Sequence, residues 1–423
     1  MHISVGIGTR EESFDVAEKN LIGIMHAARY TPPLTGEALV REALSAPVGT
    51  PRLKDLVHEG QRICIITSDV TRPLPTPVLL SPVMEELHRA HISDDQVLVA
   101  IALGSHRPQT QDELRRILGS YYGKLQVLNG DSQGLHHYGT TRAGTPVDIL
   151  QEVAEADVRI ALGNVEYHYF AGYSGGAKAI MPGVSTFEAI QANHALMCDP
   201  AAHSANIDSP VRQDLEEACR MVGLDFIVNV VLDENRQVVA CVAGDFIQAH
   251  RAAAHELDRI YGCPVSEYAD IVVVSQGGAP KDLNLYQLQK ALDNAKHPVR
   301  PGGIIILVGS CNEGVGQPTF EAWMREAHAP QDVIDRLARG FKLGGHKAAA
   351  IAQIELTKDI YLVSDLDNAT VRACFMHPYP SVAEALDAAL SVQRTRLGRE
   401  PRVLVMPHGG STLPLMCTST QPA

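Results

Sequence analysis

The fold is decided by the stretch Arg62-Ile63-Cys64-Ile65-Ile66-Thr67, which runs directly into Ser68-Asp69-Val70-Thr71-Arg72-Pro73. The first half is a short apolar run rich in β-branched residues, which is typical of a buried strand, and the second half is a polar turn. The same succession recurs at 97–103 before Gly104-Ser105-His106-Arg107, and at 158–162 before Gly163-Asn164-Val165-Glu166-Tyr167-His168. Helical patterns follow, so the sequence predicts a mostly parallel, doubly wound α/β sheet.

The three polar turns are expected to meet in space. In open α/β sheets, the loops at the carboxyl ends of parallel strands converge on the binding crevice. After the second turn, Thr110 and Glu113 form a capping box that predicts the start of a helix running through Ile117. This order of strand, loop and capped helix is what a βα unit requires.

The second half of the chain repeats the alternation. Strands are predicted at 271–275, 303–308, 360–364 and 402–406. Asn284 is expected to cap a helix that carries Tyr286, Gln287 and Lys290. A second capping box at 381–384 predicts a helix that ends near Gln393.

The length of 423 residues predicts two domains, each with its own Rossmann-like sheet. We expect an N-terminal domain at 1–264 that binds the cofactor and metal, because Gly262 and Pro264 punctuate the chain there. A C-terminal domain at 265–405 would supply substrate-binding residues. The tail at 406–423 is expected to pack back on the N-terminal domain. The active site is predicted in the cleft between the two domains.

The composition excludes several classes of protein. A hydrophobic fraction of 45% and a charged fraction of 20% are those of a soluble globular protein, and no apolar run is long enough to span a bilayer. The first residues show no secretory signal, so a cytoplasmic location is expected. A net charge of −13 argues against a nucleic-acid partner. The eight cysteines include no Cys-x-x-Cys pair, so most are expected to be small buried residues. The sequence does not determine an oligomeric state.

Two motifs are suited to anion binding. Asp69, Thr71 and Arg72 offer a carboxylate, a hydroxyl and a guanidinium that suit a phosphate or carboxylate, although a surface turn with Arg72 in water fits equally well. The run Gly172-Tyr173-Ser174-Gly175-Gly176-Ala177-Lys178 lacks the endings of a P-loop and of a dinucleotide site. Its glycines still allow a phosphate close to the backbone, with Lys178 as a cation or as a nucleophile toward a carbonyl carbon. A plain flexible turn is the alternative.

Several other side chains are candidates for chemistry. His106 and His168 suit general acid and base roles, and His194 suits a metal, while an ordinary structural role is the alternative for each. These histidines and Lys178 are all expected in loops. Gln287 and Lys290 share one helix face and could bind a carboxylate or hydroxyl, unless Lys290 simply lies in water.

Taken together, these motifs resemble the lactate racemase family of nickel-dependent 2-hydroxyacid racemases and epimerases. The resemblance covers essentially the whole chain. It rests on Asp-x-Thr-Arg-Pro at 69–73, Gly-x-His-Arg-Pro at 104–108, His168, Lys178, His194 and Tyr286-Gln287-x-x-Lys290. Each motif is modest alone, but their order and spacing make the match specific.

The resemblance implies a nickel-pincer nucleotide, a pyridinium mononucleotide whose two sulfurs and one ring carbon bind the metal. By this resemblance His194 is the nickel ligand and Lys178 can hold the cofactor covalently. The groups near the cofactor phosphate or the substrate would be Asp69, Thr71, Arg72, Gly175 and Gly176. His106 and His168 would serve one enantiomer each, Arg72 and Lys290 would hold the carboxylate, and Gln287 with Tyr286 would orient the substrate. Separate proteins would make the cofactor.

The resemblance leaves the substrate open. Members that act on lactate carry an aromatic wall, whereas the single tryptophan, Trp323, does not align with it. The region Gly344-Gly345-His346-Lys347 is cationic, so we expect a 2-hydroxyacid other than lactate, with malate as the candidate; lactate itself is the alternative. Two other classes are a zinc-type hydrolase using three histidines, and a non-catalytic protein that binds hydroxyacids or nucleotides.

Overall fold

The computed structural model describes residues 1–26, 30, 32–72, 74–233, 235–342 and 344–416. The chain divides into two compact units. The central unit comprises Tyr30–Arg259, and the terminal unit joins Met1–Arg29 to Ile260–Ala423. The first 29 residues, expected in the N-terminal domain, therefore belong with the C-terminal half. The predicted placement of the active site between domains stays a prediction.

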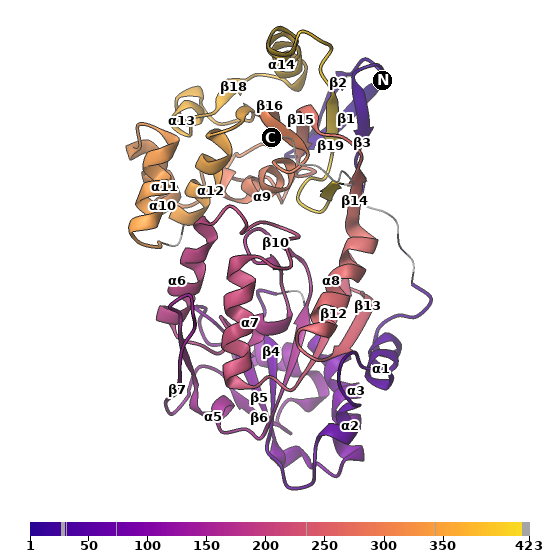
Figure 1. Cartoon of the computed structure of the whole chain (residues 1–423). Helices are drawn as coiled ribbons and strands as arrows, with labels where there is room; N and C mark the ends of the chain where they lie inside the picture. The colour runs from indigo at the N-terminus through magenta and orange to yellow at the C-terminus, as the bar shows by residue number, and fades with distance from the viewer. Residues whose placement is uncertain (27–29, 31, 73, 234, 343, 417–423) are drawn as a thin grey trace. The chain divides into compact units, whose positions relative to one another are not determined.

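The central unit is built on a six-stranded sheet (Figure 1). Its strands are β4 (Ile63–Ser68), β5 (Val97–Ala102), β6 (Gln126–Leu128), β9 (Val158–Asn164), β12 (Phe226–Leu232) and β13 (Val238–Gly244). The spatial order is β13-β12-β9-β4-β5-β6, and only β13 runs antiparallel to its neighbour. Numbered along the chain, this is the order 6-5-4-1-2-3 of a doubly wound sheet, whose topological switch point lies between β4 and β9.

Short local signals explain the helices of the central unit. Thr110 accepts a hydrogen bond from the backbone N–H of Glu113, and the Glu113 side chain accepts one from Thr110, so the predicted capping box begins α4. The helices are α1 (Glu37–Ser45), α2 (Leu53–Leu56), α3 (Thr76–Arg89), α4 (Gln111–Leu118), α5 (Gln151–Ala154), α6 (Phe187–Ala195), α7 (Pro210–Val222) and α8 (Gln248–Tyr261). Two small hairpins are added, β7 (Leu135–Thr140) with β8 (Pro146–Leu150), and β10 (Tyr167–His168) with β11 (Gly172–Tyr173).

The terminal unit has a second six-stranded sheet, in which all paired neighbours run parallel. The order is β18-β17-β16-β15-β19-β3. The strands are β3 (Leu21–Ile24), β15 (Ala269–Ser275), β16 (Val299–Val308), β17 (Asp359–Val363), β18 (His377–Tyr379) and β19 (Val403–Met406). The prediction of two α/β domains with mostly parallel sheets is therefore confirmed.

The ends of the chain are joined within the terminal unit. Strand β3 pairs with β19, and the hairpin of β1 (His2–Ile7) and β2 (Arg10–Asp15) places Ile3, Val5 and Phe14 in the terminal core. In the tail, β20 (Leu413–Met416) pairs with β14 (Gly262–Val265) in the same unit, and the predicted packing of the tail on the N-terminal domain stays a prediction. Residues 417–423 of the predicted tail lie outside the described residues.

Side-chain caps also begin helices of the terminal unit. Asn284 caps α9 as predicted, and Ser381 caps α14, which continues past Gln393 because its left-handed stop, Gly398, comes later. The helices are α9 (Leu285–Ala295), α10 (Pro318–Glu326), α11 (Pro330–Arg339), α12 (Gly345–Glu355), α13 (Asn368–Ala373) and α14 (Val382–Leu397).

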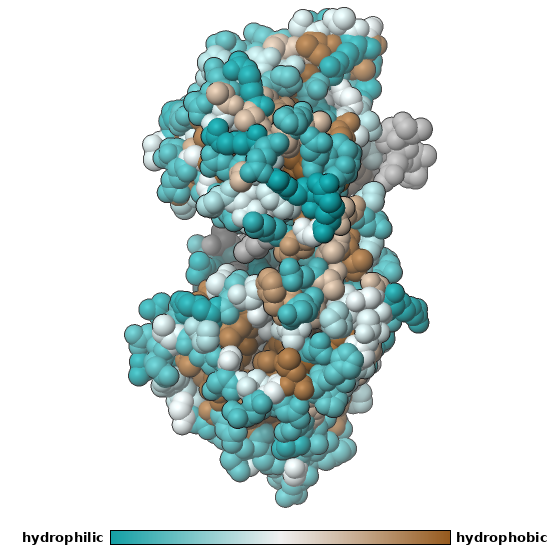
Figure 2. Space-filling model, turned by 90° about the vertical axis from the view of Figure 1, so that its left-hand side faces the viewer, coloured by the Kyte–Doolittle hydropathy of each residue, from teal (hydrophilic) through white to brown (hydrophobic). Residues whose placement is uncertain are grey.

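The surface and the cysteines agree with the composition. Hydrophilic residues cover most of the face shown in Figure 2, and apolar residues reach it in scattered patches. Within the described ranges, no helix has both the length and the apolar character needed to cross a bilayer. The seven cysteines in these ranges are free thiols, and five are buried, as expected. Cys417 lies outside the described residues.

A buried carboxyl group lies at the end of α12. The two carboxyl oxygens of Glu355 are buried and have no hydrogen-bond partner among the described residues, and burial raises its pKa well above the ordinary value. We expect Glu355→Met to stabilise the protein by about 1–3 kcal/mol, because the buried polar group is removed.

The gain should depend on pH. Because the pKa of Glu355 is raised in the folded state, its contribution to the free energy of unfolding is fully present below the unfolded-state pKa of about 4.3. That contribution is lost as pH rises through the folded-state pKa. Denaturant unfolding at pH 5 and pH 8 should therefore show the larger gain at pH 8. Glu355→Gln is the matched control, since it cannot ionise but keeps a polar group. An equal gain at both pH values would contradict the prediction.

Candidate active site

Three loops at the carboxyl ends of the central sheet carry the predicted site residues. Asp69, Thr71 and Arg72 follow β4, His106 follows β5, and His168 follows β9. Strands β4 and β9 flank the topological switch point, where doubly wound sheets bind their ligands. The fold therefore brings together residues that lie up to a hundred positions apart in the sequence. Pro73, the last residue of the first motif, lies outside the described residues.

His106 is held by a buried carboxylate. Its Nδ1 lies 2.8 Å from Oδ2 of Asp69, and the hydroxyl of Thr71 donates to the other oxygen of Asp69 at 2.7 Å. Asp69 is buried, whereas the His106 side chain is 46% exposed. A carboxylate only accepts, so Nδ1 carries the proton and Nε2 has a free lone pair. His106 is thereby oriented as a proton acceptor.

His168 and Lys178 form a second pair. The backbone N–H of Ala171 donates to Nδ1 of His168 at 3.3 Å, and Nε2 of His168 lies 3.2 Å from Nζ of Lys178. A neutral imidazole that accepts at Nδ1 carries its proton on Nε2, and an ammonium group cannot accept that proton. Both bonds are therefore made together when Lys178 is an uncharged amine.

The surrounding charges favour these neutral forms. Burial, followed by the charges of Arg212 and Arg72, lowers the pKa of Lys178 well below its ordinary value. Burial also lowers the pKa of His168, with further contributions from Lys178, Arg72, His194 and Arg212. The lowered pKa of Lys178 increases the share of this lysine that is an uncharged, nucleophilic amine at a given pH.

Phe170 connects the other site residues to this pair. Its ring lies edge-on to His168 at 4.5 Å and to His194 at 4.9 Å, and Nζ of Lys178 lies 5.6 Å from the same ring.

The prediction that these histidines and Lys178 lie in loops is wrong for three of the four residues. His194 is in the last turn of α6, which Thr186 caps, and His168 lies in β10. Lys178 lies in the short 3-10 helix at Gly176–Ala179.

Buried polar groups support the glycine-rich segment at 172–178. The guanidinium of Arg212 donates to the backbone oxygens of Ala171, Tyr173 and Gly175. Gly175 and Gly176 both have positive φ, and a Cβ at Gly175 would lie 2.6 Å from Oδ1 of Asn229. A Cβ at Gly176 would lie 2.7 Å from the ring of His250. Only glycine fits both positions, because the backbone here packs directly against Asn229 and His250.

Sequence reasoning missed four of these supporting residues: Phe170, Arg212, Asn229 and His250. Two of them had a readable signal. Arg212 lies on a helix face with Leu215 and Cys219, and Asn229 interrupts the apolar strand β12. A polar residue in such a pattern is buried with partners. Phe170 and His250 had no such signal.

The terminal unit carries the remaining predicted residues. Tyr286, Gln287 and Lys290 lie in α9, where Tyr286 and Gln287 are half-buried and Lys290 is exposed. Nζ of Lys347, in α12, donates to the backbone oxygen of Tyr286 at 2.8 Å and lies 4.1 Å from the centre of its ring. The cationic segment singled out in the sequence therefore contacts the predicted substrate-orienting helix.

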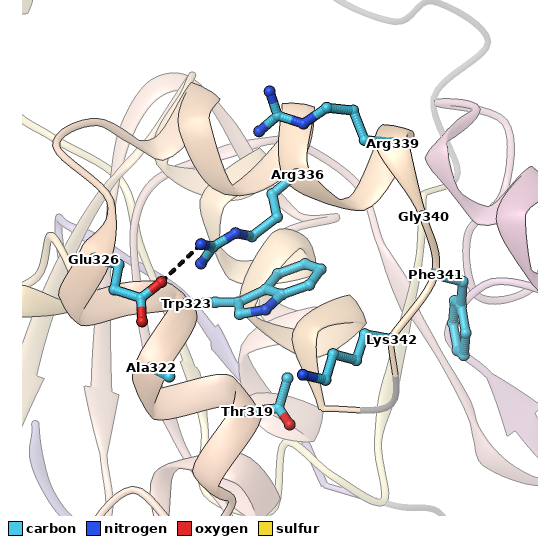
Figure 3. A pocket seen from close by; sticks show the side chains of 9 residues that line it. All are labelled: Thr319, Ala322, Trp323, Glu326, Arg336, Arg339, Gly340, Phe341 and Lys342. Atoms are coloured by element: carbon cyan, nitrogen blue, oxygen red, sulfur yellow. Dashed lines mark hydrogen bonds and ion pairs between the residues drawn. The ribbon is translucent and has the colours of Figure 1, made fainter.

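An open pocket of about 530 Å³ lies elsewhere in the terminal unit, between α10, α11 and the chain after α11. Figure 3 shows Trp323 beneath Arg336, which is paired with Glu326 at 2.7 Å, while Arg339 and Lys342 lie farther along the rim. Trp323 also packs against Gly345, where a Cβ would lie 2.6 Å from the indole. The tryptophan therefore anchors the start of α12.

Two family models match the chain. The lactate racemase N-terminal domain matches residues 7–205, and the lactate racemase C-terminal domain matches residues 265–413. The chain belongs to the lactate racemase family. Membership of the lactate racemase family makes this chain an enzyme, and specifically a racemase.

Curated lactate racemases are similar over nearly their full length. The lactate racemase of Thermoanaerobacterium thermosaccharolyticum is 32% identical over 426 residues, which cover 97% of this chain and 99% of that protein. The lactate racemase of Lactiplantibacillus plantarum is 29% identical over 407 residues, which cover 93% and 95%.

Solved structures extend the likeness to the fold. The lactate racemase apoprotein of Thermoanaerobacterium thermosaccharolyticum aligns with a TM-score of 0.83 and 30% identity, covering 98% of this chain and all of that chain. A protein of Thermotoga maritima aligns with a TM-score of 0.60 and 18% identity, covering 92% of this chain and 100% of the other, and shows the same fold.

Proposed function

We propose that this racemase inverts C2 of a 2-hydroxyacid through a 2-oxoacid intermediate, with a nickel-pincer nucleotide as its cofactor and a substrate other than lactate, malate being the candidate. The observation that carries the proposal is that the two histidines are held in opposite tautomers. His106 presents a free lone pair on Nε2, whereas His168 presents an N–H on Nε2. Inverting a carbinol carbon needs one group that takes the hydroxyl proton and another that returns one.

The described residues fit such a cofactor. Arg72 lies close enough to Lys178 for its charge to act on that amine, and it supplies a cation for a phosphate. Lys178 is a partly buried amine whose pKa lies well below the ordinary value, which favours the uncharged form that a covalent link to a carboxyl-type carbon requires. His194 would be the protein's ligand to nickel, and Asp69 and Thr71 would line the same site. When bound, the cofactor supplies a pyridinium carbon that accepts the C2 hydrogen as hydride.

His106 would take the hydroxyl proton at Nε2. Asp69 accepts from Nδ1–H, which fixes the tautomer and stabilises the cation that forms when Nε2 gains the proton. The electron pair of the O–H bond then becomes the second C–O bond of the 2-oxoacid as the C2 hydrogen departs. His106 thus acts as a positioned base for one enantiomer.

His168 would act from its Nε2–H on the substrate oxygen. Burial and neighbouring cations lower the pKa of this imidazole, and its Nε2–H can polarise the carbonyl of the 2-oxoacid by donating a hydrogen bond. As the hydrogen returns to C2, His168 would give the oxygen a proton that it has first taken from water. Protonated His106 would release its own proton to water, so that protons balance over the turnover. If the amine of Lys178 is bonded to the cofactor, it no longer accepts the hydrogen bond from Nε2–H of His168, and this N–H becomes available to the substrate. We propose that Arg72 and Lys290 bind the substrate carboxylate and that Gln287 and Tyr286 orient the substrate.

The two other classes account for less of the site. A zinc-type hydrolase needs three protein ligands, but the described residues contain no group of three or more His, Cys, Asp and Glu side chains that could hold a metal. A non-catalytic binding protein would have no use for the oriented pair of Asp69 and His106. Membership of an enzyme family favours catalysis over binding alone.

The proposal is tested with protein produced alongside the cofactor-making proteins. We expect about one nickel per chain and racemisation of at least one acid from a panel of lactate, malate, phenyllactate and an aldonate. His106→Gln and His168→Gln should each lower the rate by about 10²- to 10⁴-fold in both directions, because every full turnover uses both histidines. Chiral chromatography from each pure enantiomer measures both directions.

His88→Gln, at a histidine near the end of α3 that pairs with Asp94, is the control and should leave the rates within about twofold. Loss of only one direction in either histidine variant would contradict the two-histidine mechanism. Lactate as clearly the best substrate would contradict the substrate assignment and leave the reaction class standing. The absence of nickel and racemisation, from a host that loads a known member, would overturn the proposed function.

A further inference from the structure

A buried glutamine ends the exposed loop that carries His106. Residues 105–108 are all exposed, whereas Gln109 is only 6% exposed. The backbone N–H of Gln109 donates to Oδ1 of Asn129 at 2.9 Å, and Nδ2 of Asn129 donates to the backbone oxygen of Gln109 at 2.9 Å. Asn129 directly follows β6, the strand that pairs with β5. These two bonds therefore fix the backbone of Gln109 to the edge of the central sheet.

The side chain of Gln109 joins the loops that carry Asp69 and His106. Its Oε1 accepts a hydrogen bond from the backbone N–H of Val70 at 3.3 Å, and its Nε2 donates to the backbone oxygen of Arg107 at 3.1 Å. These partners set the orientation of the amide, because an N–H only donates and a carbonyl only accepts. Each partner is the next residue after a member of the pair. The amide thus adds a second connection beside the bond between His106 and Asp69.

The position of His106 depends on more than its bond to Asp69. The His106 side chain is 46% exposed, so the contact at Nδ1 leaves the ring and its loop free to turn about that bond. A general base must lie within hydrogen-bond reach of the proton that it takes, and a displacement of about 1 Å can cost about 10²-fold in rate. A second connection between the two loops limits such a displacement.

We propose that Gln109 is a positioning residue, whose side-chain amide keeps Nδ1 of His106 on Asp69 and thereby directs Nε2 of His106 at the substrate hydroxyl. The inference rests on the proposed function and adds a residue to it. Gln109 acts through His106 and not on the substrate, since its amide oxygen and its amino group each contact the backbone of one loop.

The tautomer of His106 reports its position in the chain without cofactor. While Asp69 accepts from Nδ1–H, the proton is held on Nδ1. Nitrogen NMR of the ring atoms at pH 8 distinguishes the two tautomers, and His106→Gln identifies the signal. In Gln109→Met, which keeps the length of the side chain but has no amide, the fraction of His106 protonated at Nδ1 should fall about twofold or more. A purely structural role would leave this fraction unchanged in the folded protein.

Gln96→Met is the matched control at the opposite end of the same strand. Gln96 directly precedes β5, and its side chain also joins two segments. Its Nε2 donates to the backbone oxygen of Gln61 at 3.1 Å, and its Oε1 accepts from the backbone N–H of Ser93 at 2.9 Å. The control loses the same kinds of hydrogen bond as Gln109→Met, but its His106 should keep the wild-type tautomer.

A second variant keeps the test decisive if Gln109→Met does not fold. Gln109→Glu retains an acceptor for the N–H of Val70 and loses the donor to the oxygen of Arg107. The fraction of His106 protonated at Nδ1 should then fall between those of the wild type and of a chain that lacks both bonds. Circular dichroism verifies that each variant is folded.

Kinetics of the loaded enzyme give the second readout. Gln109→Met should lower kcat about 10- to 10²-fold in both directions, because the base is displaced. The KM should change less than about threefold, since the groups proposed to bind the substrate carboxylate are untouched. Gln96→Met should retain the wild-type kcat and KM.

The outcomes separate the two proposals. A wild-type His106 tautomer in the folded Gln109 variants, or a kcat for Gln109→Met equal to that of Gln96→Met, would overturn the role of Gln109 even if the enzyme racemises a hydroxyacid. A changed tautomer in a protein whose loaded wild type racemises no hydroxyacid would overturn the proposed function, while Gln109 would remain the residue that positions His106. A changed tautomer together with a lowered kcat supports both.

Discussion

Lys178→Met should abolish racemisation, with a loss on the order of 10⁴-fold or more, and should remove any mass increment from the loaded protein. Methionine is close to lysine in length, so the segment at Gly176–Ala179 can keep its packing, but it has no amine that could form a covalent bond. In the proposed mechanism the cofactor would carry the difficult chemistry, so that losing its attachment would remove a whole catalytic unit. Intact mass, nickel analysis and racemisation rates measure the result.

The same lysine should be unusually reactive without cofactor. Because burial and the charges of Arg212 and Arg72 lower its pKa, Lys178 should react with an acylating reagent at pH values where ordinary lysines are protonated. The exposed Lys124 is the matched control and should react much less than Lys178 at these pH values. Lys178→Arg keeps a cation and should be as inactive as Lys178→Met. Normal activity of either variant would rule out a covalent role.

Local signals explain how much of this structure could be predicted. The strands at β4, β5 and β9 are short apolar runs closed by polar turns, and the caps at Thr110, Asn284 and Ser381 act within three residues. The meeting of Asp69 with His106 also followed from sequence, because parallel strands bring their carboxyl ends to one edge. Such features depend on neighbours in sequence or on a general rule of sheet topology.

Other features depend on partners far away along the chain. The N-terminal segments are an example. Strand β3 pairs with β19, and the apolar side chains of β1 pack in the core of the terminal unit, so both depend on residues from the second half of the chain. The lowered pKa of Lys178 could not be read from its glycine-rich context either. It arises because burial and the charge of Arg212, on a separate helix, act on the same amine.

Arg212→Met should destabilise the protein by about 3–5 kcal/mol and disorganise the segment around Lys178. Arg212 is fully buried, and its guanidinium donates to three backbone oxygens at 171, 173 and 175. Methionine fills similar space but leaves these oxygens without donors, and each unsatisfied buried group costs about 1–3 kcal/mol. Denaturant unfolding measures the loss, and Arg220→Met, on the exposed side of the same helix, should cost less than about 0.5 kcal/mol.

Amine labelling distinguishes an effect on the site from a general loss of stability. Burial lowers the pKa of Arg212 itself only to about 10, so it stays charged and contributes to the depressed pKa of Lys178 at neutral pH. In Arg212→Met, under conditions where the protein remains folded, this charge is gone and the segment that buries Lys178 has lost its support. Loss of the charge favours the ammonium form, and exposure of Lys178 to water does the same. The labelling midpoint of Lys178 should therefore move up toward the ordinary lysine pKa of about 10.4. A destabilised variant whose Lys178 kept its low midpoint would show that Arg212 supports the fold without setting the state of the site.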